Sequence, residues 1–150
     1  MTLFEELGLS VVWQKQDYIE RLQTMGGNKF REIFRWLNLP DTEYSETKKK
    51  LYHRKTELYT ELITQDLSSG VLTLRPGIRR FFGECKDRQV PIAIATACVG
   101  WAAKRVLVAA LGEEVFENLV SFCGGESTQR KKPFPDIYLL VAEQVKKNPA

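Results

Sequence analysis

Two short apolar runs, residues 91–95 and 119–122, constrain the fold of this chain more than any other feature. Neither run contains a charged residue, and turn-forming residues border both, which is typical of strands buried on both faces of a parallel sheet. A helical pattern over residues 99–111 separates the runs, and another over residues 136–146 follows them. This alternation of strands and helices predicts an α/β fold with a parallel sheet.

The first half of the chain has the apolar spacing of helices instead. The pattern predicts helices over residues 1–9, 15–25, 30–37 and 42–65, followed by a linker over residues 66–70. A further helix runs to about residue 86, and Pro76 suits its first turn. We therefore expect two domains, a helical one over residues 1–68 and a partial α/β core over residues 69–150.

Composition excludes several classes of protein. A net charge of +3 over 150 residues gives no argument for binding nucleic acid or a membrane, and the basic run 48–50 is interspersed with glutamates, as on a solvated helix face. Three cysteines and one histidine match neither a disulfide framework nor a zinc finger. Because the N-terminus has no basic region followed by an apolar run, we expect a protein that is not secreted.

Two residues follow the predicted strands, where ligands of parallel α/β sheets bind. Thr96 ends the first strand just before a helix, and its hydroxyl is suited to donating a hydrogen bond to a phosphoryl oxygen. Thr96 as a simple helix N-cap is the alternative. Lys132 follows the second strand and would place a compact positive charge beside the same anion. The alternative for Lys132, next to Arg130 and Lys131, is an ordinary solvated basic loop.

The helical half has two further candidate sites. Lys55 lies on the apolar stripe between Leu51 and Leu58, so its ammonium either reaches outward to solvent or meets an anion in a cleft. The segment 26–29, Gly-Gly-Asn-Lys, joins two helices, and its glycines allow close approach of an anion to the backbone. A plain turn between helices explains that segment equally well.

Five segments in a fixed order resemble the haloacid dehalogenase superfamily. Three lie in the predicted core, at residues 74–77 (Leu-Arg-Pro-Gly), 92–96 (Ile-Ala-Ile-Ala-Thr) and 132–138 (Lys-Pro-Phe-Pro-Asp-Ile-Tyr). The other two, residues 26–31 and 51–59, are similar to the helical cap of the CbbY-like and β-phosphoglucomutase-like branch. The resemblance implies an incomplete Rossmann-like parallel sheet with an inserted α-helical cap.

The resemblance also assigns roles in the core. Thr96 matches the second motif of the family, which hydrogen-bonds the phosphoryl group, and Lys132 matches the lysine of the third motif, which stabilises negative charge. Both are therefore candidate catalytic residues. Ala97 and Cys98 stand where the family usually has serine and asparagine, so a hydrogen bond to substrate is missing there although both positions remain candidate substrate contacts.

In the cap, the resemblance points to binding of the substrate away from the reacting phosphate. Lys29 matches the position that holds the distal phosphate of the substrate, and Gly27 and Asn28 adjoin it. Lys55 matches a cap lysine that contacts the substrate. The resemblance implies a small phosphorylated sugar as the partner, and a monomer in the intact family member.

The acidic motifs of the family have no counterpart here. The first motif of the family is Asp-x-Asp, which supplies the nucleophile and the general acid and base, and the fourth motif supplies carboxylates that bind Mg²⁺. The aspartates of this chain are Asp17, Asp41, Asp66, Asp87 and Asp136, and no two of them have that spacing. Phosphoryl transfer needs a nucleophile and a metal ion. We therefore expect Mg²⁺ to serve the intact family member but not to bind this chain.

Three hypotheses explain these observations. The parent gene encodes an Mg²⁺-dependent phosphatase or phosphomutase for small sugar phosphates, and this chain is an incomplete, inactive copy. Alternatively, the chain is a non-catalytic phosphate- or partner-binding relic, or a helical interaction module with a chance motif match. We expect a location in the cytoplasm or a plastid.

Overall fold

The computed structural model describes residues 2–20 and 35–147, and the chain divides into two compact units, Met1–Tyr59 and Thr60–Ala150. The division falls within the long helix α4 (Tyr44–Ser68). The predicted domain boundary at residue 68 instead coincides with the end of that helix. Across the described residues, no helix is long and apolar enough to cross a membrane.

The first unit is helical, with α1 (Leu3–Glu6), α2 (Lys15–Glu20), the 3₁₀ turn η3 (Asp41–Glu43) and the greater part of α4. Helix α1 begins with a capping box, in which the Thr2 hydroxyl accepts the Glu5 N–H and the Glu5 carboxylate accepts the Thr2 N–H. Gly8, with φ of 67°, follows the helix in the left-handed conformation that favours glycine. Short helices like α1 depend on packing against a longer neighbour.

Leu51 of α4 is the buried centre of this unit. Phe4 packs edge-to-face on Trp13 and Trp36, with ring centroids 5.2 and 6.0 Å away. Arg54, one turn after Leu51, hydrogen-bonds Glu6 of α1 through Nε and Nη2. The apolar side chains packed on Leu51 are Leu3, Phe4, Leu7, Leu9, Leu37, Leu39, Tyr44 and Tyr52.

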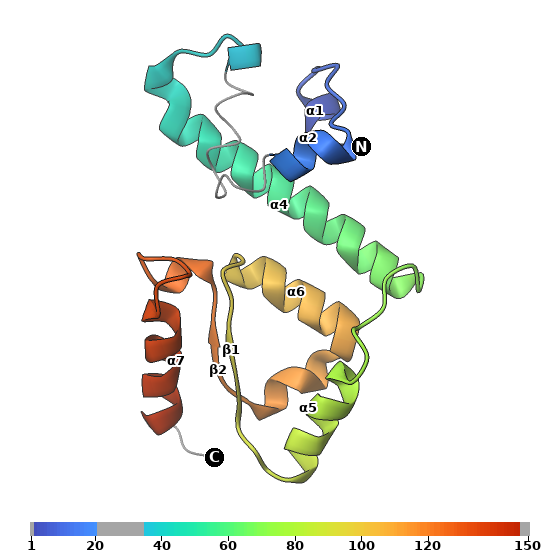
Figure 1. Cartoon of the computed structure of the whole chain (residues 1–150), viewed down its shortest axis with the longest axis vertical. Coiled ribbons are helices and arrows are strands. Elements are labelled where there is room, and N and C mark those ends of the chain that lie inside the picture. The colour runs from blue at the N-terminus through green and yellow to red at the C-terminus, as the bar shows by residue number, and fades with distance from the viewer. Residues whose placement is uncertain (1, 21–34, 148–150) are drawn as a thin grey trace. The chain divides into compact units, whose positions relative to one another are not determined.

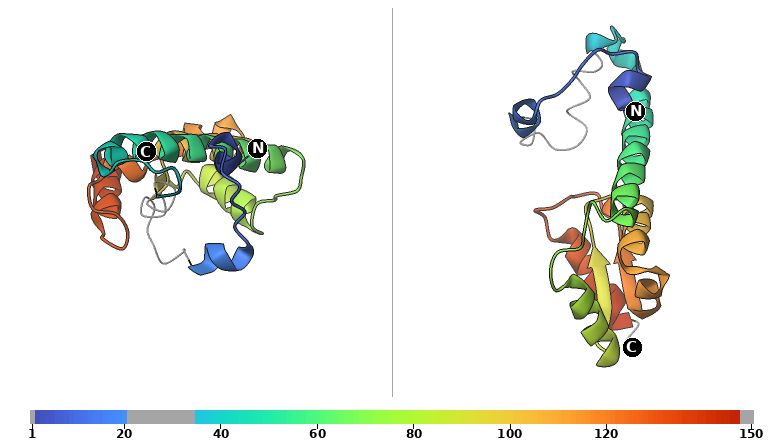
Figure 2. Two further views of the ribbon diagram at one scale, coloured as in Figure 1. Left: turned by 90° about the horizontal axis from the view of Figure 1, so that it is seen from above. Right: turned by 90° about the vertical axis from the view of Figure 1, so that its right-hand side faces the viewer.

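The second unit contains the predicted α/β pattern. Its strands β1 (Ile92–Ala95) and β2 (Leu119–Cys123) pair in parallel, with Ala95 opposite Cys123. Figure 1 shows α7 on one side of these strands and α5 and α6 on the other, and the view from above in Figure 2 agrees. The remaining elements are α5 (Ile78–Asp87), α6 (Gly100–Leu111), η4 (Glu113–Asn118), η5 (Gly125–Ser127) and α7 (Asp136–Lys147). The predicted fold, an incomplete parallel sheet with a helical portion, is confirmed.

Helix α1 covers only Leu3–Glu6 of the predicted range 1–9, and two further helices also have boundaries that differ from the prediction. Helix α4 continues through Ser68, so the predicted linker over residues 66–70 begins too early. The Ser68 hydroxyl donates to the Thr64 carbonyl at 2.8 Å, which lets a serine end the helix without disrupting it. Helix α5 starts at Ile78, because Gly77 is its N-cap in the left-handed conformation with φ of 89°. Pro76 therefore precedes the helix and does not lie in its first turn.

Candidate functional site

The carboxyl ends of the two strands meet at one edge of the second unit. The Thr96 N–H donates to the Cys123 carbonyl at 3.0 Å, which continues the ladder one residue beyond β1. Lys132, far along the chain, reaches the same edge, because its Nζ donates to the Ala95 carbonyl at 2.9 Å. Both Thr96 and Lys132 are partly buried. The structure therefore brings the two predicted core residues together.

The Thr96 hydroxyl is oriented by its own turn. Its oxygen accepts a hydrogen bond from the Cys98 N–H at 3.1 Å. A hydroxyl whose oxygen already accepts one bond keeps its hydrogen for another acceptor. The alternative of Thr96 as the helix N-cap is wrong, because Val99 is the N-cap of α6.

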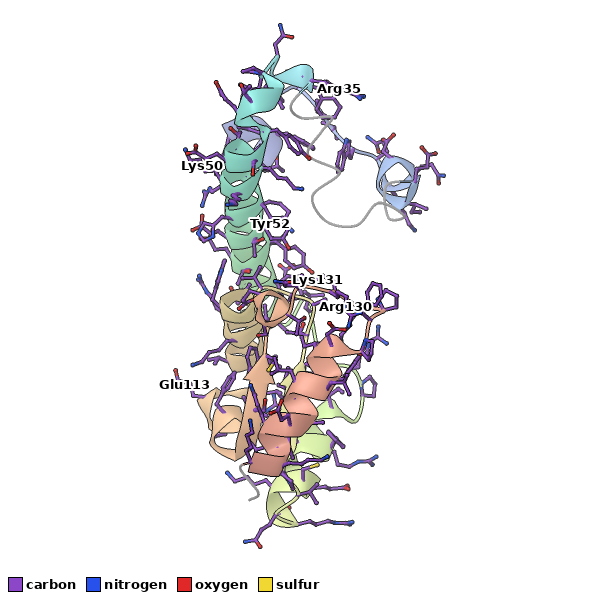
Figure 3. The ribbon with its side chains drawn as sticks, turned by 90° about the vertical axis from the view of Figure 1, so that its left-hand side faces the viewer. Arg35, Lys50, Tyr52, Glu113, Arg130 and Lys131 are labelled. Atoms are coloured by element: carbon purple, nitrogen blue, oxygen red, sulfur yellow. The ribbon has the colours of Figure 1, made fainter. Side chains whose placement is uncertain are left out.

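In the basic loop, Lys132 bonds a residue of strand β1 itself, the Ala95 carbonyl. Its ammonium lies 4.7 Å from the centroid of the Tyr138 ring, a distance at which a cation is attracted by the ring. Arg130, labelled in Figure 3, pairs with Asp136 at 2.8 Å. Lys131, labelled beside it, donates to the carbonyls of Gly125 and Thr128. These cations therefore have protein partners, although Arg130 and Lys131 are exposed.

The turn after β2 is bonded to the turn after β1. The Gly125 N–H donates to the Cys98 carbonyl at 2.6 Å. The Glu126 carboxylate accepts from the Gly100 N–H, with both oxygens at 3.0 Å. Sequence reasoning used Gly124 and Gly125 only as the end of a strand and did not single out Glu126. The available signal was a pair of glycines following a buried strand.

Ala97 and Cys98 lie between these contacts, and both are exposed. The other two cysteines, Cys85 and Cys123, are buried. The Cys98 thiol is therefore a natural chemical reporter on this turn. Contact of Ala97 and Cys98 with a substrate stays a prediction.

The predicted residues of the first unit are placed less completely. Lys55 is exposed on α4, and its Nζ lies 5.0 Å from the ring centroid of Tyr52 and 5.9 Å from that of Tyr59. The ammonium thus reaches outward to tyrosine rings, as expected of an amphipathic side chain. Its contact with substrate stays a prediction. Lys29, Gly27 and Asn28 lie outside the described residues.

Comparison with known proteins decides the family. The sequence profile of the haloacid dehalogenase-like hydrolases matches residues 3–150. The chain belongs to the haloacid dehalogenase-like hydrolases.

Within these hydrolases, the chain is similar to CbbY proteins. It is 33% identical to the plasmid-encoded CbbY of Cupriavidus necator, over 95% of this chain and 56% of the relative. It is 30% identical to a CBBY-like protein of Arabidopsis thaliana, over 98% of this chain and 47% of the relative. A crystal structure of a CbbY mutant from Rhodobacter sphaeroides, in complex with xylulose-(1,5)bisphosphate, superposes with a TM-score of 0.72 at 26% identity over 96% of this chain and 62% of that chain. The chain thus spans about half to three-fifths of the length of these relatives.

Haloacid dehalogenase-like hydrolases typically depend on Mg²⁺. Over residues 2–20 and 35–147, no group of three or more histidines, cysteines or acidic residues is placed to hold a metal ion. Glu126 bonds Gly100, and Asp136 pairs with Arg130. Mg²⁺ needs several oxygen ligands in near-octahedral geometry. The described residues therefore do not fit this ion by themselves.

Proposed function

We propose that this chain supplies the phosphoryl-binding part of an Mg²⁺-dependent phosphatase for small sugar phosphates. The observation that carries the proposal is the convergence of Thr96 and Lys132 at the carboxyl ends of β1 and β2. Ligands of parallel α/β sheets bind at that edge. A hydroxyl donor and a compact cation are the two groups that an incoming phosphate needs there.

Each group has a distinct part in binding. The Thr96 hydroxyl, with its oxygen engaged by the Cys98 N–H, directs its hydrogen to a phosphoryl oxygen. The Lys132 ammonium has three donors, of which the Ala95 carbonyl takes one. Its remaining donors and its charge stabilise an anion beside Thr96. Binding of this kind orients a phosphate ester without itself breaking a bond.

We further propose that the chain does not hydrolyse phosphate esters by itself. Neither threonine nor lysine at this edge is activated as a nucleophile by an adjacent base among the described contacts. The aspartates of the sequence also lack the Asp-x-Asp spacing expected of the family. In a longer protein that includes this sequence, the nucleophile and the Mg²⁺ ligands would come from outside residues 1–150.

A sugar phosphate is the proposed substrate class because the similar CbbY structure holds xylulose-(1,5)bisphosphate. A bisphosphate carries a second phosphate away from the reacting one, which calls for further cations. Lys29 is the proposed contact for that distal phosphate, and Lys55 is a further proposed contact with the substrate. A non-catalytic protein that only binds phosphate esters is the second candidate, favoured by the retained pair Thr96 and Lys132.

Protection of Cys98 tests the phosphate site directly. N-ethylmaleimide reacts with the thiolate of the exposed Cys98, so the rate of each variant with phosphate is compared with its own rate without phosphate. We expect inorganic phosphate to slow this modification. In Lys132→Ala, roughly tenfold more phosphate is needed for the same protection, because a hydrogen bond to a charged group contributes about 1.5–3 kcal/mol.

Lys146→Ala, which removes an exposed lysine of α7, is the matched control and keeps the protection of the unmodified chain. Equal protection in the wild type and in Lys132→Ala would show that the proposed site does not bind phosphate. Turnover of p-nitrophenyl phosphate by the isolated chain in Mg²⁺ would contradict the second part of the proposal. The longer protein is expected to hydrolyse small sugar phosphates and to lose that activity in excess chelator.

A further inference from the structure

The two turns at the strand edge are packed too closely for side chains. A Cβ at Gly125 would lie 2.3 Å from the Ala97 carbonyl oxygen, and one at Gly124 would lie 2.7 Å from the Gly100 Cα. Real Cβ atoms do not approach backbone this closely. Glycines at these positions therefore let the turn after β2 rest directly on residues 97–100, the segment that follows Thr96.

Glu126 closes the same contact with its carboxylate. Both oxygens lie 3.0 Å from the Gly100 nitrogen, at the first residue of α6. Among the described residues, the N-cap Val99 contributes no side-chain hydrogen bond to the helix. A carboxylate at a helix N-terminus satisfies a free N–H and interacts favourably with the helix dipole. Glu126 thus supplies from the next turn the cap that α6 lacks in its own sequence.

Gly100 makes that approach possible. A Cβ at this position would lie 2.5 Å from Glu126 Oε1, so the carboxylate occupies the space that a side chain would fill. The segment between Thr96 and Gly100 is then bonded at three places. Thr96 bonds Cys123, Cys98 accepts from Gly125, and Gly100 donates to Glu126.

We propose that Glu126 is a positioning residue, which holds the 96–100 turn in the conformation that binds a phosphoryl group without touching that group itself. This inference rests on the proposed function and extends it to a residue outside the phosphate contacts. Glu126 acts through its bond with Gly100, and the bond between the Gly125 N–H and the Cys98 carbonyl holds the turn that carries Glu126 beside that residue. Positioning by Glu126 raises the affinity for phosphate, but the negative charge of its carboxylate lowers that affinity, because an anion near a phosphate site weakens binding of phosphate.

Two substitutions separate these opposing effects. Glu126→Gln keeps an oxygen acceptor for the Gly100 N–H but removes the charge, whereas Glu126→Ala removes both. In the Cys98 protection assay, we expect the affinity of Glu126→Gln for inorganic phosphate to lie within threefold of the wild-type affinity, or to exceed it. We expect Glu126→Ala to bind at least threefold more weakly than Glu126→Gln. Equal affinities in the two variants, whether raised or lowered, would overturn a positioning role.

Amide spectroscopy tests the same inference without phosphate. In ¹⁵N-labelled chain, Glu126→Ala is expected to shift the amide signals of Cys98 and Gly100 and to speed hydrogen exchange at Gly100, while Glu126→Gln leaves them near wild type. Unchanged Cys98 and Gly100 signals in Glu126→Ala would refute the inference. If Glu126→Ala shifts these signals but phosphate does not protect Cys98 in the wild type, the proposed function fails and the positioning contact stands. Glu143→Ala, which removes an exposed glutamate of α7 and its ion pair with Lys147, is the control for loss of an acidic side chain away from the turn.

Discussion

The units Met1–Tyr59 and Thr60–Ala150 hold their elements together in different ways. In the first, long side chains make the contacts, with Leu51 beneath a layer of leucines and aromatics. In the second, the backbones of two turns touch through Gly100, Gly124 and Gly125. The first unit is therefore sensitive to lost side-chain volume, whereas the site in the second unit is sensitive to added atoms.

Loss of side-chain volume at Leu51 is expected to have the largest effect on stability. Leu51→Ala is expected to destabilise the first unit by about 2–5 kcal/mol, because a buried leucine leaves a cavity when truncated. Hydrogen exchange measured by mass spectrometry should then speed up over residues 44–59 and change little over residues 92–123. Leu62→Ala, on the same helix but 55% exposed, should have a much smaller effect. Equal acceleration in both units would contradict the division.

Addition of one methyl group at Gly125 is the next strongest test. Gly125→Ala forces the new Cβ against the Ala97 carbonyl, and overpacking of this kind costs about 1–3 kcal/mol. We expect faster hydrogen exchange over β1 and β2 and loss of phosphate protection at Cys98. The first unit should be unaffected. A variant that binds phosphate like wild type would show that the glycine contact is dispensable.

Gly83→Ala is the matched control, since it adds the same methyl group where there is room. Gly83 lies inside α5, and a Cβ there would meet no described heavy atom within 4 Å. Alanine is the better helix former by about 1 kcal/mol, so this change is expected to stabilise the chain and raise its thermal midpoint. Destabilisation by Gly83→Ala would mean that the cost at Gly125 is not specific to the crowded turn.

Acidification is expected to have the smallest effect on stability, and it acts on the first unit. Hydrogen bonds from Arg54 lower the pKa values of Glu6 and Glu57 below their ordinary value of 4.5. A lowered carboxyl pKa contributes stability above the unfolded value, and that contribution is lost as pH falls through the lowered pKa. We therefore expect the protection of α1 amides from hydrogen exchange, relative to the intrinsic exchange rate at each pH, to fall modestly below about pH 4.5. Arg54→Met should remove this acid dependence, and an unchanged profile in that variant would contradict the assignment.

Local pattern was enough to predict most elements. The apolar run at Ile92, the helical spacing after Gly100 and the turn at Gly124 depend on neighbours within a few residues, so their periodicity is visible in one chain. The ends of helices were predicted less well. Ser68 remains helical and Pro76 lies outside α5, because single hydrogen bonds and one glycine φ angle decide such boundaries.

The sequence by itself determined that Thr96 follows one buried strand and that Lys132 follows another, and strand ends in a parallel sheet share an edge. Only the tertiary structure decided what these groups bond: Lys132 meets the Ala95 carbonyl, and Glu126 caps Gly100. Those partners are 37 and 26 positions apart in the chain. No local periodicity encodes such pairs, because their distance depends on how strands, turns and helices pack together.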